Sequence, residues 1–194
     1  MSGYHAIILA AGAGSRFGGR KLLAPWRGEP LVRAAARIAL AAPVDFCVAV
    51  TGCDAEAIEA ALEGLDAVRL RTELTKDWEE GIAASLRSGL AALPHDSRGA
   101  VIFLGDMPLV LPDAAARLIA ALEAGAAAAE VVYDGQPAHP VAYSPAFFPA
   151  LAALRGNRGG RSLLAGRRDV ACLSTEHAGA VFDVDVTTDL AREA

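Results

Sequence analysis

The sequence contains little cysteine, no excess of positive charge and no apolar run long enough to cross a bilayer. Its 3 cysteines are odd in number and form no C-x-x-C pair, which argues against a disulfide framework and against a zinc site. A formal net charge of −5 excludes a general attraction to nucleic acid or to an anionic membrane. No basic segment precedes the first apolar run, so we expect neither a signal peptide nor a membrane segment. These absences indicate a reduced, cytoplasmic setting, in which any bound anion is held by a local cluster of cations.

Three common signatures are missing as well. There is no G-x-S-x-G elbow to present a nucleophilic serine. There is no Gly-Lys-Ser/Thr ending of a P-loop, and the first loop departs from the dinucleotide pattern G-x-G-x-x-G. Its third glycine comes one position late, and Thr51 and Gly52 stand where a ribose-binding carboxylate would follow the next strand. The pattern therefore argues against a nicotinamide- or flavin-binding oxidoreductase.

What is present is a glycine-rich loop that directly follows a short apolar strand candidate, His5–Ala10. The loop runs from Leu9 to Lys21 and reads L-A-A-G-A-G-S-R-F-G-G-R-K. Glycines allow backbone N–H groups to approach phosphate oxygens closely, and cations neutralise the phosphate charge. With Arg16 and Lys21 five positions apart, the loop is suited to a triphosphate.

Apolar runs alternate with helical patterns along the chain. This rhythm predicts right-handed crossovers and a three-layer α/β/α, Rossmann-like fold, with a mostly parallel sheet and a small antiparallel extension. We expect one domain over residues 1–194. The predicted strands are His5–Ala10, Val44–Thr51, Ala67–Arg71, Ala100–Leu104, Glu130–Tyr133, His139–Tyr143 and Val181–Asp185. The predicted helices are Pro30–Ala41, Asp54–Leu62, Glu80–Leu93, Pro112–Ala124, Pro145–Leu154 and Gly160–Ala165.

Carboxylates follow two of the predicted strands. Asp106 lies in L-G-D-M-P just past a buried strand, and Asp183 and Asp185 close an apolar run. Each alone is typical of a turn, but two carboxylates near a triphosphate suit an octahedral Mg²⁺ that keeps several waters. Because alternation places Asp183 and Asp185 on the same side of a strand, the sequence leaves the choice between them open.

Two further segments have a structural and a functional interpretation. The stretch 77–86 is a helix start with acidic residues in its first turn, in which Gly81 and Ser85 could also meet a base or a ribose. His139 on a strand is by itself more typical of a structural histidine. The Gly/Arg loop 155–161 is either a solvated turn or a site for the phosphate of a second substrate at a helix N-terminus.

Taken together, the chain resembles the molybdenum cofactor cytidylyltransferases within the wider molybdopterin nucleotidyltransferase family. The opening loop matches L-A-A-G-x-G-S-R-F-G-x-x-K, and the resemblance covers nearly the whole chain. The stretches D-W-x-x-G-I-x-x-S-L, L-G-D-M-P, H-P-V, G-N-R-G-G-R and D-V-D-V-T-T-D-L favour the cytidylyl over the guanylyl branch. The chain departs from the family pattern at Thr75, Ala138, Asn157 and Val186, which bears on the identity of the acceptor and of the base.

The resemblance implies a transfer of CMP from CTP to the terminal phosphate of molybdopterin, with Mg²⁺ and with release of pyrophosphate. It implies catalytic roles for Arg16, Lys21 and Asp106 and metal binding by Asp106 and Asp185. The acceptor would lie near His139, Asn157 and Arg161. The nucleotide would be bound by Leu9, Ala10, Ala11, Gly12, Gly14, Ser15, Arg16, Lys21, Gly81, Ser85 and Asp106.

Other interpretations remain open at this point. The same chemistry could use GTP in place of CTP, or a sugar or polyol phosphate as acceptor. A different class of protein would bind CTP without turnover, as a partner or chaperone of a molybdoenzyme.

Overall fold

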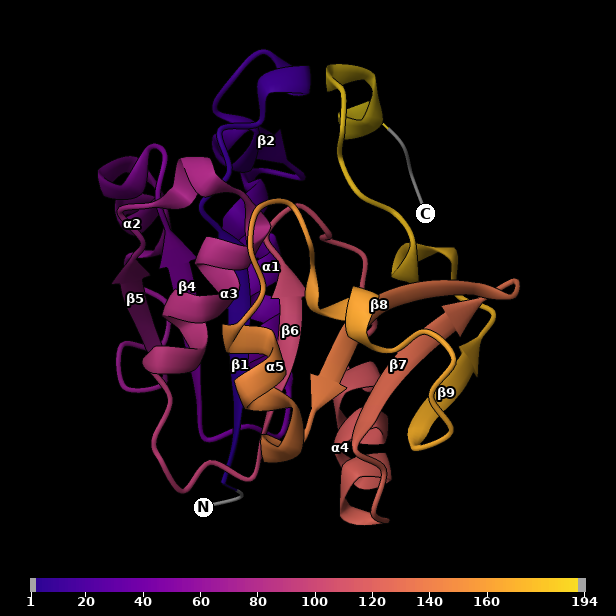
Figure 1. Ribbon diagram of the computed structural model, residues 1–194. Helices are drawn as coiled ribbons and strands as arrows, with labels where there is room; N and C mark the ends of the chain where they lie inside the picture. The colour runs from indigo at the N-terminus through magenta and orange to yellow at the C-terminus, as the bar shows by residue number, and fades with distance from the viewer. Residues whose placement is uncertain (1–2, 192–194) are drawn as a thin grey trace.

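The protein is built on a seven-stranded sheet, which the computed structural model describes over residues 3–191 (Figure 1). The strands lie in the order β5-β4-β1-β6-β8-β7-β9. Every neighbouring pair is parallel except the two that involve β8. The bounds are β1 Tyr4–Ala10, β4 Phe46–Thr51, β5 Leu70–Leu74, β6 Gly99–Leu104, β7 Ala128–Tyr133, β8 Gln136–Tyr143 and β9 Val170–Thr175. A separate antiparallel pair joins β2 Pro25–Trp26 and β3 Glu29–Pro30.

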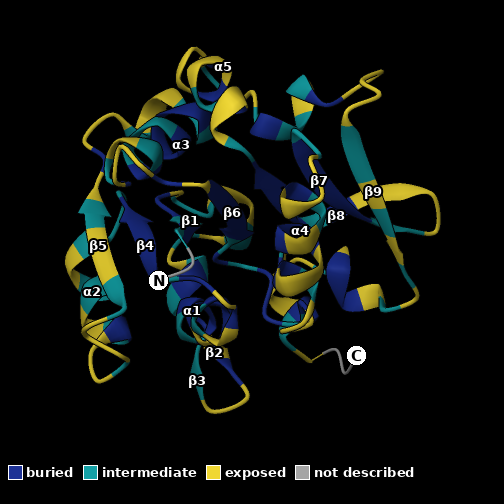
Figure 2. Ribbon diagram, turned by 90° about the horizontal axis from the view of Figure 1, so that it is seen from below, coloured by how far each residue is buried: buried dark blue, intermediate teal, exposed yellow. Residues whose placement is uncertain are grey.

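Helices cover both faces of the sheet, which confirms the predicted α/β architecture (Figure 2). One face carries α1 Leu31–Ala41, α2 Ala55–Leu62 and α4 Ala114–Glu123, and the other carries α3 Ile82–Ala91 and α5 Phe148–Ala152. Two apolar clusters fill the space between these layers, one on each side of the sheet. Short 3-10 turns are η1 Ser15–Phe17, η2 Lys21–Leu23, η3 Trp78–Glu80, η4 Pro145–Phe147, η5 Gly160–Leu163, η6 Ala178–Ala180 and η7 Thr187–Ala191.

The central strands are mostly apolar because both of their faces are buried, and the buried polar exceptions in β1 and β4 are His5 and Thr51. In β4 every residue is buried, and in β1 only Leu9 is partly exposed. Such continuous apolar runs are typical of parallel strands between two helical layers. Within residues 3–191, no helix is both long and apolar enough to cross a membrane.

The strand order reverses direction between β1 and β6. From β1 the chain moves outward to β4 and β5, and it then returns to pair β6 on the other side of β1. In open α/β sheets, ligands bind beyond the carboxyl ends of the strands at such a reversal. The loops that leave β1 and β6 lie there, and the last residues of the described chain approach them (Figure 1).

The carboxyl-terminal third of the chain corrects three predictions. Residues 181–185 form no strand, and the outer strand is instead β9, which pairs with β7. The side chain of Val184 is buried in a small cluster with Trp26, whereas Asp183 is exposed and Asp185 is half-buried. The predicted helix after Gly160 is only the single turn η5. The hairpin of β7 and β8 is tighter than expected, since Asp134 and Gly135, both with positive φ, make its turn.

Candidate functional site

The glycine-rich loop after β1 folds back on itself and places Lys21 beside Gly14. The Gly14 carbonyl accepts hydrogen bonds from the backbone N–H groups of Phe17 (2.9 Å) and Gly19 (3.1 Å). Gly14 has φ +61°, and a Cβ at this position would lie 2.6 Å from the Cβ of Lys21. A side chain is therefore excluded by backbone conformation and by space, and this close approach carries Lys21 under the loop.

Lys21 is the centre of a charge cluster at the ends of the loop and of β6. Its Nζ lies 2.6 Å from Oδ2 of Asp106 and 3.4 Å from Oδ1 of Asp185. Only 13% of the Lys21 side chain is exposed. Burial alone would lower the pKa of Lys21, but the two carboxylates outweigh it and raise that pKa. Lys21 is therefore a permanently charged ammonium in the neutral pH range.

Arg16 supplies a second cation from the exposed side of the loop. Its Nη1 lies 3.0 Å from Oδ2 of Asp185, and 82% of its side chain is exposed. An ion pair as exposed as this one contributes little to stability. The guanidinium is therefore free to turn toward an anion that enters the cleft.

The segment that carries Asp185 is held in place by Asp189. The Asp189 Oδ2 accepts hydrogen bonds from the backbone N–H groups of Asp185 and Val186, each at 3.0 Å. Asp183 lies near the same carboxylates. Burial raises its pKa, and the negative charges of Asp185 and Asp106 raise it further. Of the two aspartates that the sequence could not separate, Asp185 is the one placed against Lys21 and Arg16.

The opposite wall of the cleft is the entry to α3. Gly81 has φ +114°, and a Cβ there would lie 2.7 Å from the Gly156 carbonyl oxygen and would collide with Asn157. The chain therefore needs glycine at the point where loop 155–161 closes over η3. The cleft between this wall and the glycine-rich loop has a volume of about 400 Å³. It is lined by Leu9, Ala11, Gly12, Ala13, Gly14, Lys21, Leu22, Trp78, Glu79, Gly81, Ile82, Ser85, Leu104, Asp106 and Asn157.

A second cavity of about 190 Å³ continues from the cleft toward β8. Leu9, Ile82 and Leu104 line both spaces, so the two are contiguous. Its other lining residues are Leu86, Ile102, His139, Val141, Tyr143, Gly159, Gly160 and Arg161. Gly160 packs on the ring of Tyr143, since a Cβ there would lie 2.7 Å from the phenolic oxygen.

His139 stands at the irregular point of β8, opposite the register shift between Glu130 and Val131. Its Nδ1 is buried without a hydrogen-bond partner, although the residue as a whole keeps part of its surface open. Burial and then the charge of Arg161 lower the pKa of His139 to about 3. The imidazole is therefore neutral at physiological pH.

We expect the free energy of unfolding to fall less on acidification in His139→Gln than in the wild type. Because the unfolded chain protonates this histidine near pH 6.5 and the folded protein does not until about pH 3, wild-type stability falls as pH drops through this window. Urea unfolding at pH 7 and pH 4.5 should show a drop smaller by on the order of 2 kcal/mol in the variant. The exposed His95 provides the matched control, His95→Gln. Equal drops in the wild type and in His139→Gln would contradict the buried, neutral imidazole.

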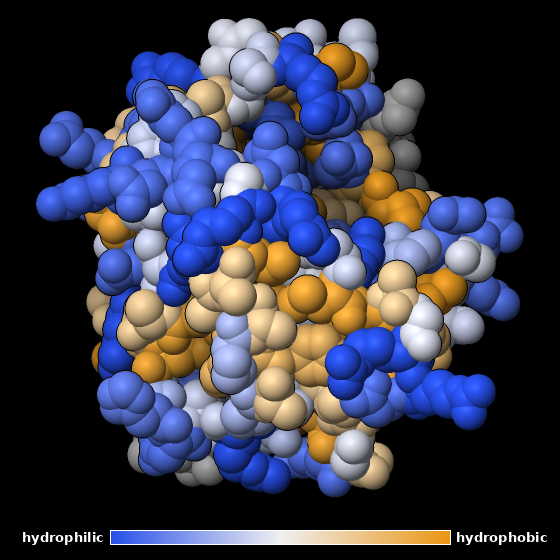
Figure 3. Space-filling model, viewed as in Figure 1, coloured by the Kyte–Doolittle hydropathy of each residue, from blue (hydrophilic) through white to orange (hydrophobic). Residues whose placement is uncertain are grey.

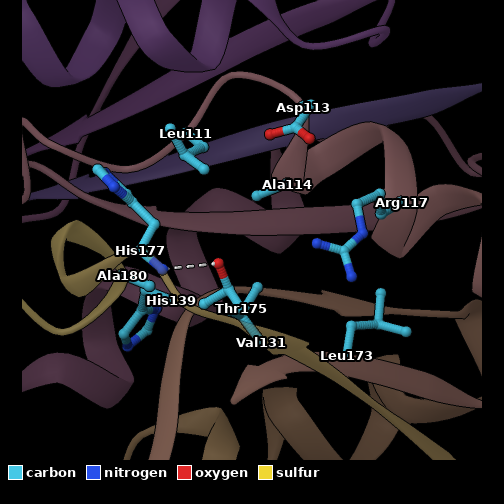
Figure 4. A pocket seen from close by; sticks show the side chains of 10 residues that line it. All are labelled: Leu111, Asp113, Ala114, Arg117, Val131, His139, Leu173, Thr175, His177 and Ala180. Carbon is cyan, nitrogen blue, oxygen red and sulfur yellow. Dashed lines mark hydrogen bonds between the residues drawn. The ribbon is translucent and has the colours of Figure 1, made fainter. Parts of the chain in front are cut away.

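On the opposite face of the sheet, His139 also borders a narrow pocket beside α4 (Figure 4). The Arg117 guanidinium points into this pocket, and the backbone N–H of His177 donates to Oγ1 of Thr175 (Figure 4). The His177 ring extends away from it, with Nε2 2.8 Å from the Leu109 carbonyl oxygen. With a volume of about 10 Å³, the pocket holds no more than a water molecule. The candidate site is the 400 Å³ cleft with its 190 Å³ extension, because the glycine-rich loop, Lys21 and Asp106 line that cleft.

Most of the sequence-predicted residues lie in one region of the structure, but they are divided between the cleft and the second cavity, and some line neither. Ala10 is fully buried and does not line the cleft, and Ser15 lies on the exposed turn η1. Asn157, which the resemblance placed with the acceptor, lines the cleft, whereas His139 and Arg161 line the second cavity.

Several residues at the site carried no separate prediction. Trp78 covers one side of the cleft by packing on Gly52, where an added Cβ would lie 2.6 Å from the Cβ of Trp78. Tyr143 and Glu130 lie at the second cavity or behind it. The sequence marks Glu130 only as a carboxylate within the apolar run 128–132. Its partner, Arg161, lies 31 positions further along the chain, so the sequence does not indicate the pairing.

The carboxylates fit a hard divalent cation. Lys21 Nζ lies within 3.4 Å of both Asp106 and Asp185, so oxygens from two segments converge on one positive charge. Within residues 3–191 no group of three or more His, Cys, Asp or Glu side chains could enclose a metal by itself. Two protein carboxylates, completed by phosphate oxygens and water, are the arrangement typical of Mg²⁺.

Comparison with known proteins identifies a family. The family model described as the MobA-like NTP transferase domain matches residues 6–172. Nicotine blue oxidoreductase of Paenarthrobacter nicotinovorans is 32% identical over 166 residues, which are 81% of this chain and 79% of that protein. A 2-C-methyl-D-erythritol 4-phosphate cytidylyltransferase of Synechococcus sp. is 37% identical over 63% of this chain, which spans 54% of the length of that relative.

The same comparison with solved structures confirms the fold. Rv0371c of Mycobacterium tuberculosis H37Rv superposes with a TM-score of 0.83 and 32% identity, covering 96% of this chain and 94% of that one. A structure of Rv0371c in complex with manganese superposes with a TM-score of 0.79 and 29% identity, covering 96% of this chain and 95% of that one.

Proposed function

This chain belongs to the family of MobA-like NTP transferase domains, and we propose that it transfers CMP from CTP to the terminal phosphate of molybdopterin. The observation that carries the proposal is the convergence of Lys21, Asp106 and Asp185 beneath the glycine-rich loop. A reaction between two anionic phosphates needs cations to offset the repulsion between the phosphates. It also needs groups that hold those cations in position, and the two carboxylates can do this. Residues 1–194 would act as one nucleotidyltransferase domain.

In this proposal the nucleotide occupies the 400 Å³ cleft. The backbone of Leu9 to Gly12 would bind the base, and Gly81 and Ser85 would contact the base or ribose from the α3 side. Gly14, Ser15, Arg16 and Lys21 would hold the triphosphate. Support comes from the lining of the cleft, in which Gly12, Gly14 and Lys21 face Gly81 and Ser85.

The reaction is an in-line displacement. An oxygen of the acceptor phosphate forms a bond to the α-phosphorus, the bond from that phosphorus to the bridging oxygen breaks, and pyrophosphate leaves with the electron pair. Lys21 and Arg16 would stabilise the negative charge on the phosphates and on the leaving group. The acceptor phosphate is already ionised at neutral pH, so no general base is required.

Asp106 and Asp185 would hold a divalent cation, which when bound supplies Lewis-acid stabilisation of phosphate charge. In the structure described here these carboxylates are paired with Lys21 and Arg16. Both cations would then turn from the carboxylates to phosphate oxygens. The manganese complex of the related Rv0371c supports the use of a divalent ion, and Mg²⁺ is our proposal for this chain.

The experiment measures pyrophosphate release with Mg²⁺ and molybdopterin, using CTP or GTP. We expect release with CTP, and the cytidylyltransferase among the relatives favours this choice of nucleotide. Release with GTP alone would assign the guanylyl reaction to the same site. No release with either nucleotide, despite CTP binding, would contradict the proposal and favour a sugar or polyol phosphate acceptor or a binding role without turnover. Because one relative is named as an oxidoreductase, family membership alone does not fix the reaction. The assay therefore measures nucleotidyl transfer itself.

A further inference from the structure

A charged pair lies behind the second cavity. Glu130 projects from β7, with 11% of its side chain exposed, and its Oε2 is 3.8 Å from Nε of Arg161. This distance makes an ion pair without a hydrogen bond. The Sγ of Cys172, its register partner on β9, lies 3.9 Å from the other carboxylate oxygen. Arg161 lines the cavity and Glu130 stands behind it, so Glu130 acts on the cavity through Arg161.

The unsatisfied polar atoms of the protein gather here. Among residues 3–191, the buried side-chain nitrogen and oxygen atoms without a hydrogen-bond partner are Oε2 of Glu130, Nδ1 of His139, and Nε and Nη2 of Arg161. Burying such groups without a hydrogen bond is costly, so each of them requires a partner from a ligand or from water. Three residues from β7, β8 and η5 share this property around one cavity. Their clustering indicates a place built for a polar ligand group.

The walls and the charge of the cavity restrict that group. The side chains of Leu9, Ile82, Leu86, Ile102, Leu104 and Val141 make the walls apolar. Figure 3 shows hydrophobic residues gathered at the centre of this face, below a hydrophilic band. The polar end offers one cation, Arg161, paired with one anion, Glu130, beside a neutral imidazole. The one positive and the one negative charge at this end of the cavity therefore cancel.

We propose that Glu130 is a positioning residue that holds Arg161 and cancels its charge, so that the cavity accepts an uncharged, hydrogen-bond-accepting end of the acceptor. Arg161 offers donors only, so the matching group is a carbonyl oxygen or a ring nitrogen. Apolar walls with one polar end suit a flat heterocycle, whose faces are apolar and whose edge is polar. A second phosphate would meet the Glu130 carboxylate and is disfavoured. The heterocycle rests on the proposed function, whereas the charge balance does not.

Inorganic phosphate is the probe that tests the charge balance without an acceptor. We expect Glu130→Gln, which keeps the shape and removes the charge, to bind phosphate about tenfold more tightly than the wild type in calorimetry. The gain in phosphate affinity should vanish in the double variant Glu130→Gln/Arg161→Met. Because this variant keeps Lys21, any binding that it still shows measures the phosphate held at Lys21. Equal affinities in the wild type and in Glu130→Gln would overturn the proposal. If Glu130→Gln does not fold, the wild type and Arg161→Met are compared instead, and tighter phosphate binding by the wild type would overturn it.

Kinetics test the positioning role. With molybdopterin and CTP, Glu130→Gln should raise the KM for molybdopterin about tenfold and leave kcat and the KM for CTP within about twofold. Glu130→Asp should restore part of the loss, and Arg161→Met should add little to Glu130→Gln, because the two residues act as a unit. A fall in kcat without a change in this KM would overturn the positioning role. If the wild type does not use molybdopterin, the proposed function fails while the phosphate measurement still decides the charge balance.

Discussion

Lys21→Met is expected to lower kcat/KM for CTP by about 10²–10³, a loss of about 3–4 kcal/mol of transition-state stabilisation. Lys21 is the cation that lies deepest in the cleft, with its Nζ against Asp106 and Asp185. In the transition state the negative charge shifts onto the departing pyrophosphate, and a buried ammonium stabilises this charge more strongly than a solvated one. Methionine keeps most of the apolar stem and removes the ammonium group, with its charge and its hydrogen-bond donors. The measurement is steady-state pyrophosphate release.

The matched control for this variant is Lys76→Met, because Lys76 is exposed and lies outside the residues that line the cleft. It should keep full activity. Thermal unfolding of Lys21→Met separates catalysis from folding, since two carboxylates lose their partner when Lys21 is replaced. A folded Lys21→Met enzyme with normal turnover would remove Lys21 from the reaction.

Asp106→Asn is expected to reduce activity by about 10³ and to move its divalent-cation dependence to higher concentration, in line with the several kcal/mol that a bound metal supplies to charge stabilisation. Asparagine preserves the shape of the side chain but lacks the negative charge that a hard cation and Lys21 both need. The Asp106 charge also helps to raise the pKa of Lys21, so the variant lowers that pKa. Titration of the activity with Mg²⁺ measures the fall in activity and the shift in its cation dependence. Titration of the protein alone with Mn²⁺, followed by electron paramagnetic resonance, measures metal binding directly.

Asp113→Asn is the control for this second variant. Asp113 is exposed at the start of α4 and lines the narrow pocket on the other face of the sheet. It should change neither the activity nor the metal titration. If Asp106→Asn bound Mn²⁺ as tightly as the wild type and retained full metal-dependent activity, Asp106 would not be a metal ligand.

The local patterns in the sequence were sufficient where one segment decides its own structure. The apolar run before the glycine-rich loop predicted β1, because a strand buried on both faces needs continuous apolar residues. The run before Asp106 predicted β6 in the same way. Since parallel strands present their carboxyl ends at one edge, the loops after both strands were expected in one crevice. Lys21 and Asp106 are indeed in contact there.

The tertiary structure decided what depends on contacts between distant segments. A short apolar run suggested a strand at 181–185, but Val184 is buried against the distant Trp26 and not within the sheet, so this prediction was wrong. Asp185 lies against Lys21 in a segment whose turn is capped by Asp189, a contact that the sequence pattern does not predict. The pairing of Glu130 with Arg161 required β7 and η5 to meet across the second cavity. Residue type and local spacing thus determined the fold class and carry the proposed phosphate-binding chemistry, because both follow from single segments. The electrostatic balance of each cavity was decided only by packing, because it depends on which charges from different segments come together.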